Sequence, residues 1–195
     1  TSIMVATGKG AQHGILIRGG EPLEAANKIN AMIFDKTGTL SKGKPEVTDV
    51  VALSRAHGAA AKEDIVKIAA SLEQGSEHPL AESIVNYAKK HKTPLSSTQK
   101  FKAIAGHGVE GEINGKMYFL GNRRLMEKIA VSEIAAEEIL TALEDEGKTA
   151  MLLADEKHIL GIIAVADTLK ETSKEAVSKL KEMGLEIYMI TGDNK

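Results

Sequence analysis

The segment 31–40 constrains this chain more than any other, and it reads Ala-Met-Ile-Phe-Asp-Lys-Thr-Gly-Thr-Leu. The apolar run that opens it predicts a buried strand. The run stops at Asp35, and the polar residues that follow are typical of a loop at the carboxyl end of a strand. Ligands of open α/β sheets bind at that edge. A carboxylate held there is a candidate nucleophile toward phosphorus, because carboxylates form covalent aspartyl-phosphates.

The composition is that of an ordinary soluble protein and disfavours several classes. Hydrophobic residues make up 43% and charged residues 27% of the 195 residues. The formal net charge of −2 gives no electrostatic reason to expect nucleic acid as a partner. The lack of cysteine removes disulfides and thiolate metal ligands from consideration. No stretch approaches the roughly 20 apolar residues of a membrane span, and no signal peptide is expected.

A second strand and polar loop lie near the other end of the chain. The apolar run 185–190 predicts a strand, and it leads directly into the polar run Thr-Gly-Asp-Asn at 191–194. Between the two strand–loop segments the pattern changes, with Pro45 at the boundary. This layout predicts an α/β domain into which a smaller α+β domain is inserted, with crossings near 45–48 and 163–168.

The middle of the chain carries helix and hairpin patterns. Apolar residues at helical spacing predict helices over 65–72 and 80–88, with Pro79 at the start of the second. Asn114-Gly115 between two apolar runs predicts a type I′ hairpin. The remaining predicted elements are a helix from Ser132 to Gly147, a hairpin around 155–157, and a helix that a capping box at 168–171 opens and Gly184 ends. Residues 1–20 lack a clean period and are expected to form a connecting segment.

Phosphoryl transfer requires an in-line nucleophile, charge neutralisation and donors to the phosphate oxygens. Asp35 supplies the nucleophile, and Thr37 and Thr39 supply hydroxyl donors. Gly38 lets backbone N–H groups approach an anion closely. The tripeptide Asp-Lys-Thr alone would indicate an ordinary polar turn. The whole string, following an apolar strand, favours phosphoryl chemistry.

The string at 31–40 resembles the phosphorylation motif of the P-type ATPases, within the haloacid dehalogenase superfamily. The loop at 191–194 resembles that family's second motif, whose threonine contacts the phosphoryl group and whose aspartate lies near the nucleotide. Asp167 lies in a segment that resembles the family's hinge, and it also fits a helix N-cap. Phosphatases of the superfamily commonly carry a second aspartate where this chain has Thr37. The resemblance therefore implies a slowly hydrolysed phosphoaspartate, which suits a pump.

The middle of the chain resembles the nucleotide-binding domain of the heavy-metal-transporting branch. Glu73 and the run Ser-Glu-His-Pro at 76–79 match that branch's signature, in which the glutamate and the histidine help to position adenine. A histidine such as His78 before a helical proline is, by itself, more often a cap or a packing residue. The neighbouring matches favour the binding role.

The run 106–111 spells GxGxxG, but we reject a dinucleotide site there. That fingerprint requires a strand, a turn and a helix, whereas this run leads into the predicted hairpin. In the resembled family the glycines that match Gly106 and Gly108 let the backbone approach ATP. Gly121 and Asn122 match a further Gly-Asn pair in the nucleotide pocket. The chain's histidines have no metal-ligand spacing, and Arg123 is expected to be a solvated surface residue.

The resemblance thus implies two sets of site residues. The expected catalytic residues are Asp35, Lys36, Thr37, Thr191, Gly192 and Asp193. The expected nucleotide-binding residues are Glu73, His78, Gly106, Gly108, Gly121 and Asn122. The implied cofactors are ATP and Mg²⁺, and Asp35 and Thr37 are the expected Mg²⁺-binding residues.

The implied fold class is α/β, a partial haloacid dehalogenase-like Rossmann-type phosphorylation domain with an inserted α+β nucleotide-binding domain built on an antiparallel sheet. We expect a linker from the membrane domain at 1–22, the incomplete phosphorylation domain at 23–47 and 164–195, and the nucleotide-binding domain at 48–163. The family's catalytic unit continues past Asn194 with a phosphate-contacting lysine and a Mg²⁺-binding aspartate. The chain is therefore expected to be a fragment that is inactive alone, with poorly supported outer strands.

The resemblance implies the ATP-binding and aspartyl-phosphorylation region of an ATP-driven heavy-metal exporter, on the cytoplasmic side of an integral membrane protein. Its implied partners are ATP and the membrane and actuator domains of the same parent chain. The segment 7–11 and the Ser-Glu-His-Pro run favour Cu⁺ as the cargo over zinc or cadmium, with the metal bound outside this chain. Two alternatives are a soluble haloacid dehalogenase-type phosphatase, which Thr37 disfavours, and a nucleotide-binding module without turnover.

Overall fold

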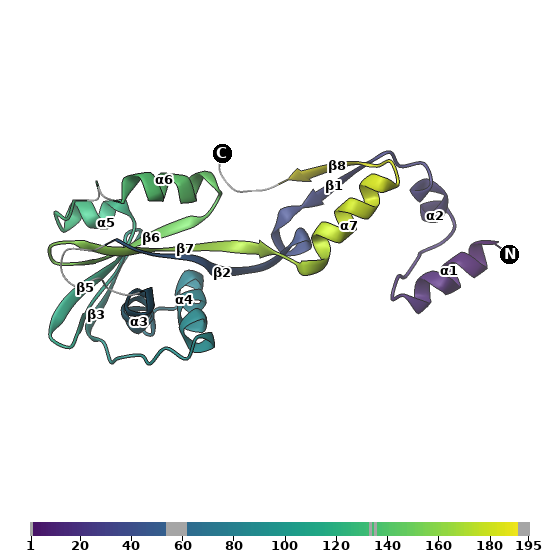
Figure 1. Cartoon of the computed structure of the whole chain (residues 1–195). Helices are drawn as coiled ribbons and strands as arrows, with labels where there is room; N and C mark the ends of the chain where they lie inside the picture. Colours follow the sequence, from purple (N-terminus) through teal and green to yellow (C-terminus); the bar gives the residue numbers. More distant parts are fainter. Residues whose placement is uncertain (1, 54–61, 133, 135, 191–195) are drawn as a thin grey trace. The chain divides into compact units, whose positions relative to one another are not determined.

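The computed structural model describes residues 2–53, 62–132, 134 and 136–190. The chain forms two compact units (Figure 1). The first contains the described residues of Thr1–Ser41 and Leu169–Asn194, and the second contains those of Lys42–Thr168. The second unit is thus inserted in sequence between two parts of the first, and the predicted mixed α/β architecture is confirmed.

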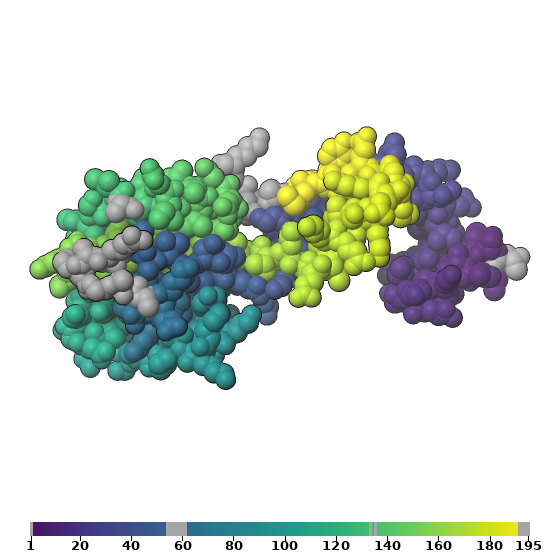
Figure 2. All heavy atoms as spheres, in the orientation of Figure 1, coloured from purple at the N-terminus to yellow at the C-terminus, as the bar shows by residue number. Residues whose placement is uncertain are grey.

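The first unit is built around two parallel strands. The strand β1 (Ala31–Asp35) pairs in register with β8 (Glu186–Ile190), and the turn η1 (Lys36–Leu40) follows β1. Its helices are α1 (Ser2–Gln12), α2 (Glu21–Ala26) and α7 (Glu171–Glu182). In the space-filling view, α7 and β8 form a yellow surface on the side that faces the viewer (Figure 2).

The strands of this unit exist as predicted, but they are not buried. The side chains of Ile33 and Tyr188 are 62% and 54% exposed. The reason is that β1 and β8 have only each other as neighbours among the described strands, so most of the sheet surface has no covering layer. The prediction of a buried strand at 31–34 is therefore wrong in burial and right in secondary structure.

Residues 2–12 form the helix α1, which was not predicted and which has no buried residue. Two local predictions for the outer segments are also wrong. The capping box at 168–171 does not form, because Thr168 lies in a strand and α7 begins at Glu171 without a side-chain cap. Asp167 lies in the same strand and is not a helix cap. The predicted end of α7 at Gly184 is confirmed by its φ of 83° and its bond to Lys181.

The second unit contains a six-stranded sheet with the strand order β2-β7-β6-β5-β4-β3. Its strands are β2 (Ser41–Ala52), β3 (Gln99–Ile104), β4 (Gly108–Ile113), β5 (Lys116–Gly121), β6 (Thr149–Asp155) and β7 (Ile159–Leu169). The pairings from β3 through β7 are antiparallel. The Asn114-Gly115 hairpin is confirmed, with φ of 52° and 78° at its two central residues.

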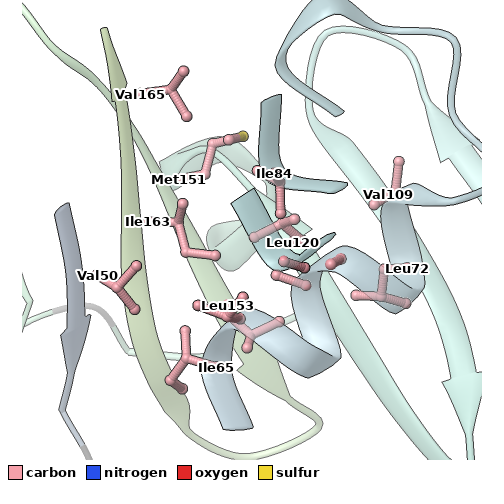
Figure 3. Packing of buried hydrophobic residues seen from close by; sticks show 14 of the residues in the cluster. Val50, Ile65, Leu72, Ile84, Val109, Leu120, Met151, Leu153, Ile163 and Val165 are labelled. Carbon is pink, nitrogen blue, oxygen red and sulfur yellow. The ribbon is translucent and has the colours of Figure 1, made fainter. Parts of the chain in front are cut away.

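Helices cover both faces of this sheet (Figure 1). They are α3 (Lys62–Glu73), α4 (Pro79–Lys90), α5 (Arg123–Lys128) and α6 (Glu137–Asp145). Successive strand residues point to opposite faces, so Met151 and Leu153 join one hydrophobic cluster while Leu152 joins the other. Figure 3 shows the first cluster, in which Leu72 and Ile84 from the helices face strand residues such as Leu120 and Ile163.

The structure corrects the predicted elements of this unit in three places. The helix predicted from Ser132 is α6, which begins at Glu137. The elements β3 and α5 were not predicted, because each has six residues and no clear period. Pro45 does not end a segment but lies inside β2, which is an edge strand and therefore tolerates a residue without an N–H.

Candidate functional site

Asp35 is the last residue of β1, and its exposed carboxylate stands at the carboxyl end of the strand. Its Oδ1 accepts a hydrogen bond of 3.1 Å from the backbone N–H of Thr37. That bond folds the chain sharply at the end of the strand. The predicted nucleophile therefore lies where the strand–loop pattern placed it.

The turn η1 after Asp35 has a fixed internal geometry. Gly38 has a φ of 73°, and a Cβ added there would meet nothing within 4 Å, so glycine is needed for the backbone conformation alone. The N–H of Gly38 donates to Ser41 Oγ at 3.1 Å, and the Ser41 hydroxyl donates to the carbonyl oxygen of Lys36 at 2.8 Å. Ser41 is fully buried, so its hydroxyl group is shielded from water.

Thr191, Gly192 and Asp193 lie outside the described residues. The residue before them, Ile190, pairs with Asp35 in the parallel register. No group of three or more histidine, aspartate or glutamate side chains able to hold a metal ion occurs among the described residues. Within the same described ranges, no helix is long and apolar enough to span a bilayer.

The second unit contains a cavity of about 400 Å³, which the predicted nucleotide-binding residues line. All six of them line it, namely Glu73, His78, Gly106, Gly108, Gly121 and Asn122. They come from the end of α3, the start of α4, the β3–β4 turn and the end of β5. Such a volume falls within the range of small-molecule sites.

Glu73 is the most unusual side chain of this cavity. Glu73 is only 6% exposed, and its Oε2 is the one buried side-chain nitrogen or oxygen atom without a hydrogen-bond partner among the described residues. Burial raises the pKa of the carboxyl above its ordinary value of 4.5, and a hydrogen bond with Ser76 partly opposes that rise. A buried acceptor without a donor is costly, so this oxygen is available to a ligand that brings its own N–H or O–H.

His78 is the N-cap of α4, as its position before Pro79 predicts. Its Nδ1 accepts a hydrogen bond of 3.2 Å from the backbone N–H of Leu80. Because Nδ1 must be bare to accept, the neutral ring carries its proton on Nε2. The capping and binding interpretations are therefore compatible, since Nε2–H remains to serve as a donor to a ligand.

The glycines of the cavity are required for different reasons. A Cβ on Gly108 would lie 2.1 Å from the carbonyl oxygen of Leu120, and one on Gly121 would lie 2.2 Å from the carbonyl oxygen of His107. These two glycines thus permit a close backbone approach between the end of β5 and the chain at the start of β4. Gly106 has a φ of 70° with nothing within 4 Å of its added Cβ, so only the backbone conformation requires glycine there.

Asn122 links the cavity to the adjacent helix. Its Oδ1 accepts from the backbone N–H of Leu125 at 3.2 Å and so caps α5. Its Nδ2 donates to the carbonyl oxygen of Gly106 at 2.9 Å. Both ends of the side chain therefore hold protein groups, and Asn122 shapes the β3–β4 turn.

Arg123 is not a free surface cation. Its guanidinium lies 3.1 Å from a carboxylate oxygen of Glu137 and 2.6 Å from one of Glu144, and these bonds raise the pKa of Arg123. The expected solvated role is thus replaced by a link between α5 and α6. An arginine paired with two carboxylates carries little net charge for a phosphate.

Several residues that line the cavity were not predicted from the sequence. Thr149, Ala150 and Met151 of β6 and Ile104 of β3 form part of the lining, and so does His107. Their local sequence gives no signal of a site, because strand alternation predicts a core face and does not show which strand end borders a cavity. The strand residues of this lining are mainly apolar and offer a surface against which a flat ring could pack.

Comparison with known proteins gives the family. The haloacid dehalogenase-like hydrolase family matches residues 29–195, which include the second unit and part of the first. This chain belongs to the haloacid dehalogenase-like hydrolases. Within them, it is homologous to the phosphorylation and nucleotide-binding region of copper-exporting P-type ATPases.

Three similar proteins are all described as ATPases or as a domain of one. A copper-exporting P-type ATPase of Staphylococcus aureus (strain bovine RF122 / ET3-1) is 46% identical over 197 residues, which cover 100% of this haloacid dehalogenase-like chain and 23% of the relative. A zinc-transporting PIB-type ATPase in an E2.Pi state has a TM-score of 0.88 at 33% identity, covering 98% of this chain and 30% of that one. The catalytic domain of the CPx-ATPase CopB-B, studied upon nucleotide binding, has a TM-score of 0.64 at 26% identity, with 97% and 64% covered.

This haloacid dehalogenase-like chain spans about a quarter of the length of the curated relatives it matches. The named relatives include a copper-exporting P-type ATPase and a zinc-transporting PIB-type ATPase, so the comparisons leave the transported metal open.

Proposed function

We propose that this chain binds ATP in the cavity of its second unit and accepts the γ-phosphoryl group on Asp35. The second unit is then the nucleotide-binding domain, and the first is part of the phosphorylation domain. The observation that carries the proposal is the convergence of six predicted residues on one cavity that contains a buried carboxylate oxygen without a partner.

The cavity suits adenine for a chemical reason. Glu73 Oε2 needs a hydrogen-bond donor, and the exocyclic amino group of adenine is one. His78 Nε2–H supplies a donor for a ring nitrogen of the base. The apolar lining from β6 offers a face against which the ring can pack.

The phosphoryl step assigns distinct roles to the first unit. The Asp35 carboxylate attacks the γ-phosphorus, the bond to the bridging oxygen breaks, and ADP leaves with that oxygen. Asp35 and Thr37 would provide oxygen ligands for Mg²⁺, a hard cation that prefers oxygen donors. Bound there, Mg²⁺ would neutralise negative charge on the phosphoryl group. The exposed carboxylate at the strand end fits this role. Lys36, Thr191, Gly192 and Asp193 complete the proposed catalytic set.

The larger function is that of an ATP-driven metal exporter with Cu⁺ as the cargo. The named copper-exporting relative, which aligns with the whole chain, supports this choice. The Cu⁺ site and the actuator domain then belong to other parts of a membrane-inserted parent protein. This chain then lies on the cytoplasmic side, where ATP is available.

The binding part is tested by titrating the ¹⁵N-labelled chain with ATP and following the backbone amides by NMR. The expected result is a set of shifts at Glu73, His78, Gly106 and Gly108, with β8 amides unaffected. The absence of shifts around the cavity at millimolar ATP would overturn the assignment. Rapid hydrolysis of a generic phosphomonoester such as p-nitrophenyl phosphate would instead favour a phosphatase.

A further inference from the structure

Three side chains outside the segment 35–39 hold carbonyl groups of the turn after Asp35. Ser41 Oγ donates to Lys36 at 2.8 Å, Lys170 Nζ donates to Gly38 at 2.7 Å, and Ser173 Oγ donates to Leu40 at 2.7 Å. Alternate carbonyl groups of the turn are therefore each tied to a side chain in the same unit. The backbone N–H of Lys170 also donates to Leu40, at 2.9 Å.

These anchors are not equivalent. Ser41 and Ser173 are buried, and they hold the two ends of the turn. Lys170 is exposed and holds the middle, at the glycine. Gly38 is the residue of the turn with the greatest backbone freedom, and nothing lies within 4 Å of the position its Cβ would take. The ammonium of Lys170 is therefore the side-chain contact that fixes the orientation of the Gly38 peptide group.

We propose that Lys170 is a positioning residue for phosphorylation of Asp35, acting through the Gly38–Thr39 peptide group. The inference rests on the proposed function of Asp35. In a trans peptide the carbonyl of one residue and the N–H of the next point in opposite directions. Lys170 on the Gly38 carbonyl thus fixes the direction of the Thr39 N–H, a potential donor to a phosphate oxygen.

The charge of Lys170 acts in the same direction. A transferred phosphoryl group carries roughly 1.5 to 2 negative charges, which it brings to the turn. An ammonium already bonded to that turn stabilises this charge without reorganising at the moment of transfer. A neutral side chain at position 170 would neither fix the Gly38–Thr39 peptide group nor supply the positive charge.

The test uses the full-length protein that contains this chain, with γ-labelled ATP and acid quench. The variants are Lys170→Met, Lys170→Arg and the control Lys174→Met, which removes the same charge one turn further along α7. Lys170→Met should slow phosphoenzyme formation at saturating ATP roughly ten- to hundredfold, the range for a lost charged hydrogen bond. The ATP dissociation constant and the unfolding midpoint should not change, because the backbone bond to Leu40 and the Ser173 bond remain.

Lys170→Arg should restore the rate to within about threefold, since it keeps the charge and the donor. Lys174→Met should phosphorylate at the wild-type rate. Normal phosphorylation of Lys170→Met, or failure of arginine to rescue, would overturn the role of Lys170 while leaving Asp35 as the nucleophile. A loss of ATP affinity in parallel with the rate would show a general structural effect and also overturn it.

The variant Asp35→Asn separates this inference from the proposed function. It should give no hydroxylamine-sensitive phosphoenzyme. If Asp35→Asn is phosphorylated normally, or the wild-type protein is not phosphorylated, the proposed function fails and the role of Lys170 fails with it. If only Lys170→Met behaves as wild type, the proposed function stands.

Discussion

Ile190 lies directly opposite Asp35 in the parallel pairing of β8 with β1. Parallel strands place their carboxyl ends at the same edge of a sheet, which is where ligands of such sheets bind. The chain therefore leaves β8, toward Thr191 in the sequence, at the edge where β1 ends in the proposed nucleophile. Asp35 and Ile190 thus end two strands at one sheet edge although they lie about 155 residues apart in sequence, because the whole second unit is inserted between them.

The first prediction concerns a conflict between stability and binding at Glu73. Glu73→Met removes a buried carboxylate with an unpaired oxygen and keeps the side-chain length. We expect it to raise the free energy of unfolding by on the order of 1–3 kcal/mol and to weaken ATP binding at least fivefold. Urea unfolding and calorimetric titration measure the two effects, with the exposed neighbour Glu77→Met as the control. If Glu73→Met binds ATP with the affinity of the wild type, Glu73 does not contribute to the binding site.

The second prediction concerns pH. Burial raises the pKa of Glu73 in the folded state, so the folded protein binds more protons at this group than the unfolded chain. The group therefore lowers stability as pH rises from about 4.5, its ordinary pKa, through the raised value. The wild type should lose stability relative to Glu73→Gln over this window. Unfolding midpoints of both proteins between pH 4 and 7 test this, and a constant difference between them would contradict it.

The sequence predicted those features that have a strong local pattern. The strand before Asp35, the Asn114-Gly115 hairpin and the cap at His78 each depend on a few adjacent residues. Burial of β1 was not predictable in the same way. An apolar run shows that a strand can be buried, but its covering layer must come from elsewhere in the structure, and here Ile33 is exposed.

Six of the expected site residues line one cavity, but the physical reasons for their residue types could not be predicted from the sequence. The resemblance identified Gly108 and Gly121, but only the structure shows that each is required by a close backbone approach between strands. Asn122 is bonded at both ends to protein groups, which no single-sequence pattern reveals. Residues such as Met151 remained unpredicted because their contribution depends on which strand end borders the cavity.

The third prediction separates the two roles of His78. His78→Asn keeps an acceptor for the Leu80 N–H, because asparagine is a good N-cap, but it lacks the Nε2–H group. We expect His78→Asn to keep the thermal stability of the wild type and to make the free energy of ATP binding less favourable by about 1–2 kcal/mol. His78→Ala should lose the cap as well and unfold at a lower temperature. Equal ATP affinity in wild type and His78→Asn would show that His78 is only a cap.

The fourth prediction ranks the glycines of the cavity. Gly121→Ala forces a methyl group against the carbonyl oxygen of His107, so it should destabilise the fold by about 3 kcal/mol. Gly106→Ala has open space and only the cost of a positive φ, about 1–2 kcal/mol. Thermal unfolding of both variants gives the order. A Gly121→Ala protein as stable as Gly106→Ala would contradict the close approach.

The last prediction compares the two units by native-state hydrogen exchange. In β6 both faces are covered, since Leu152 and Leu153 point to opposite hydrophobic clusters and neither is exposed. The backbone hydrogen bonds of β1 belong to a two-stranded sheet, in which the side chain of Ile33 is mostly exposed. A sheet of only two strands is marginally stable. Amides of β1 and β8 should therefore exchange through local opening, at least tenfold faster than those of β6 after correction for intrinsic rates. Mass spectrometry of peptic fragments measures both sets in one sample. Equal protection of β1 and β6 would mean that the two-stranded sheet gains support from contacts not seen among the described residues.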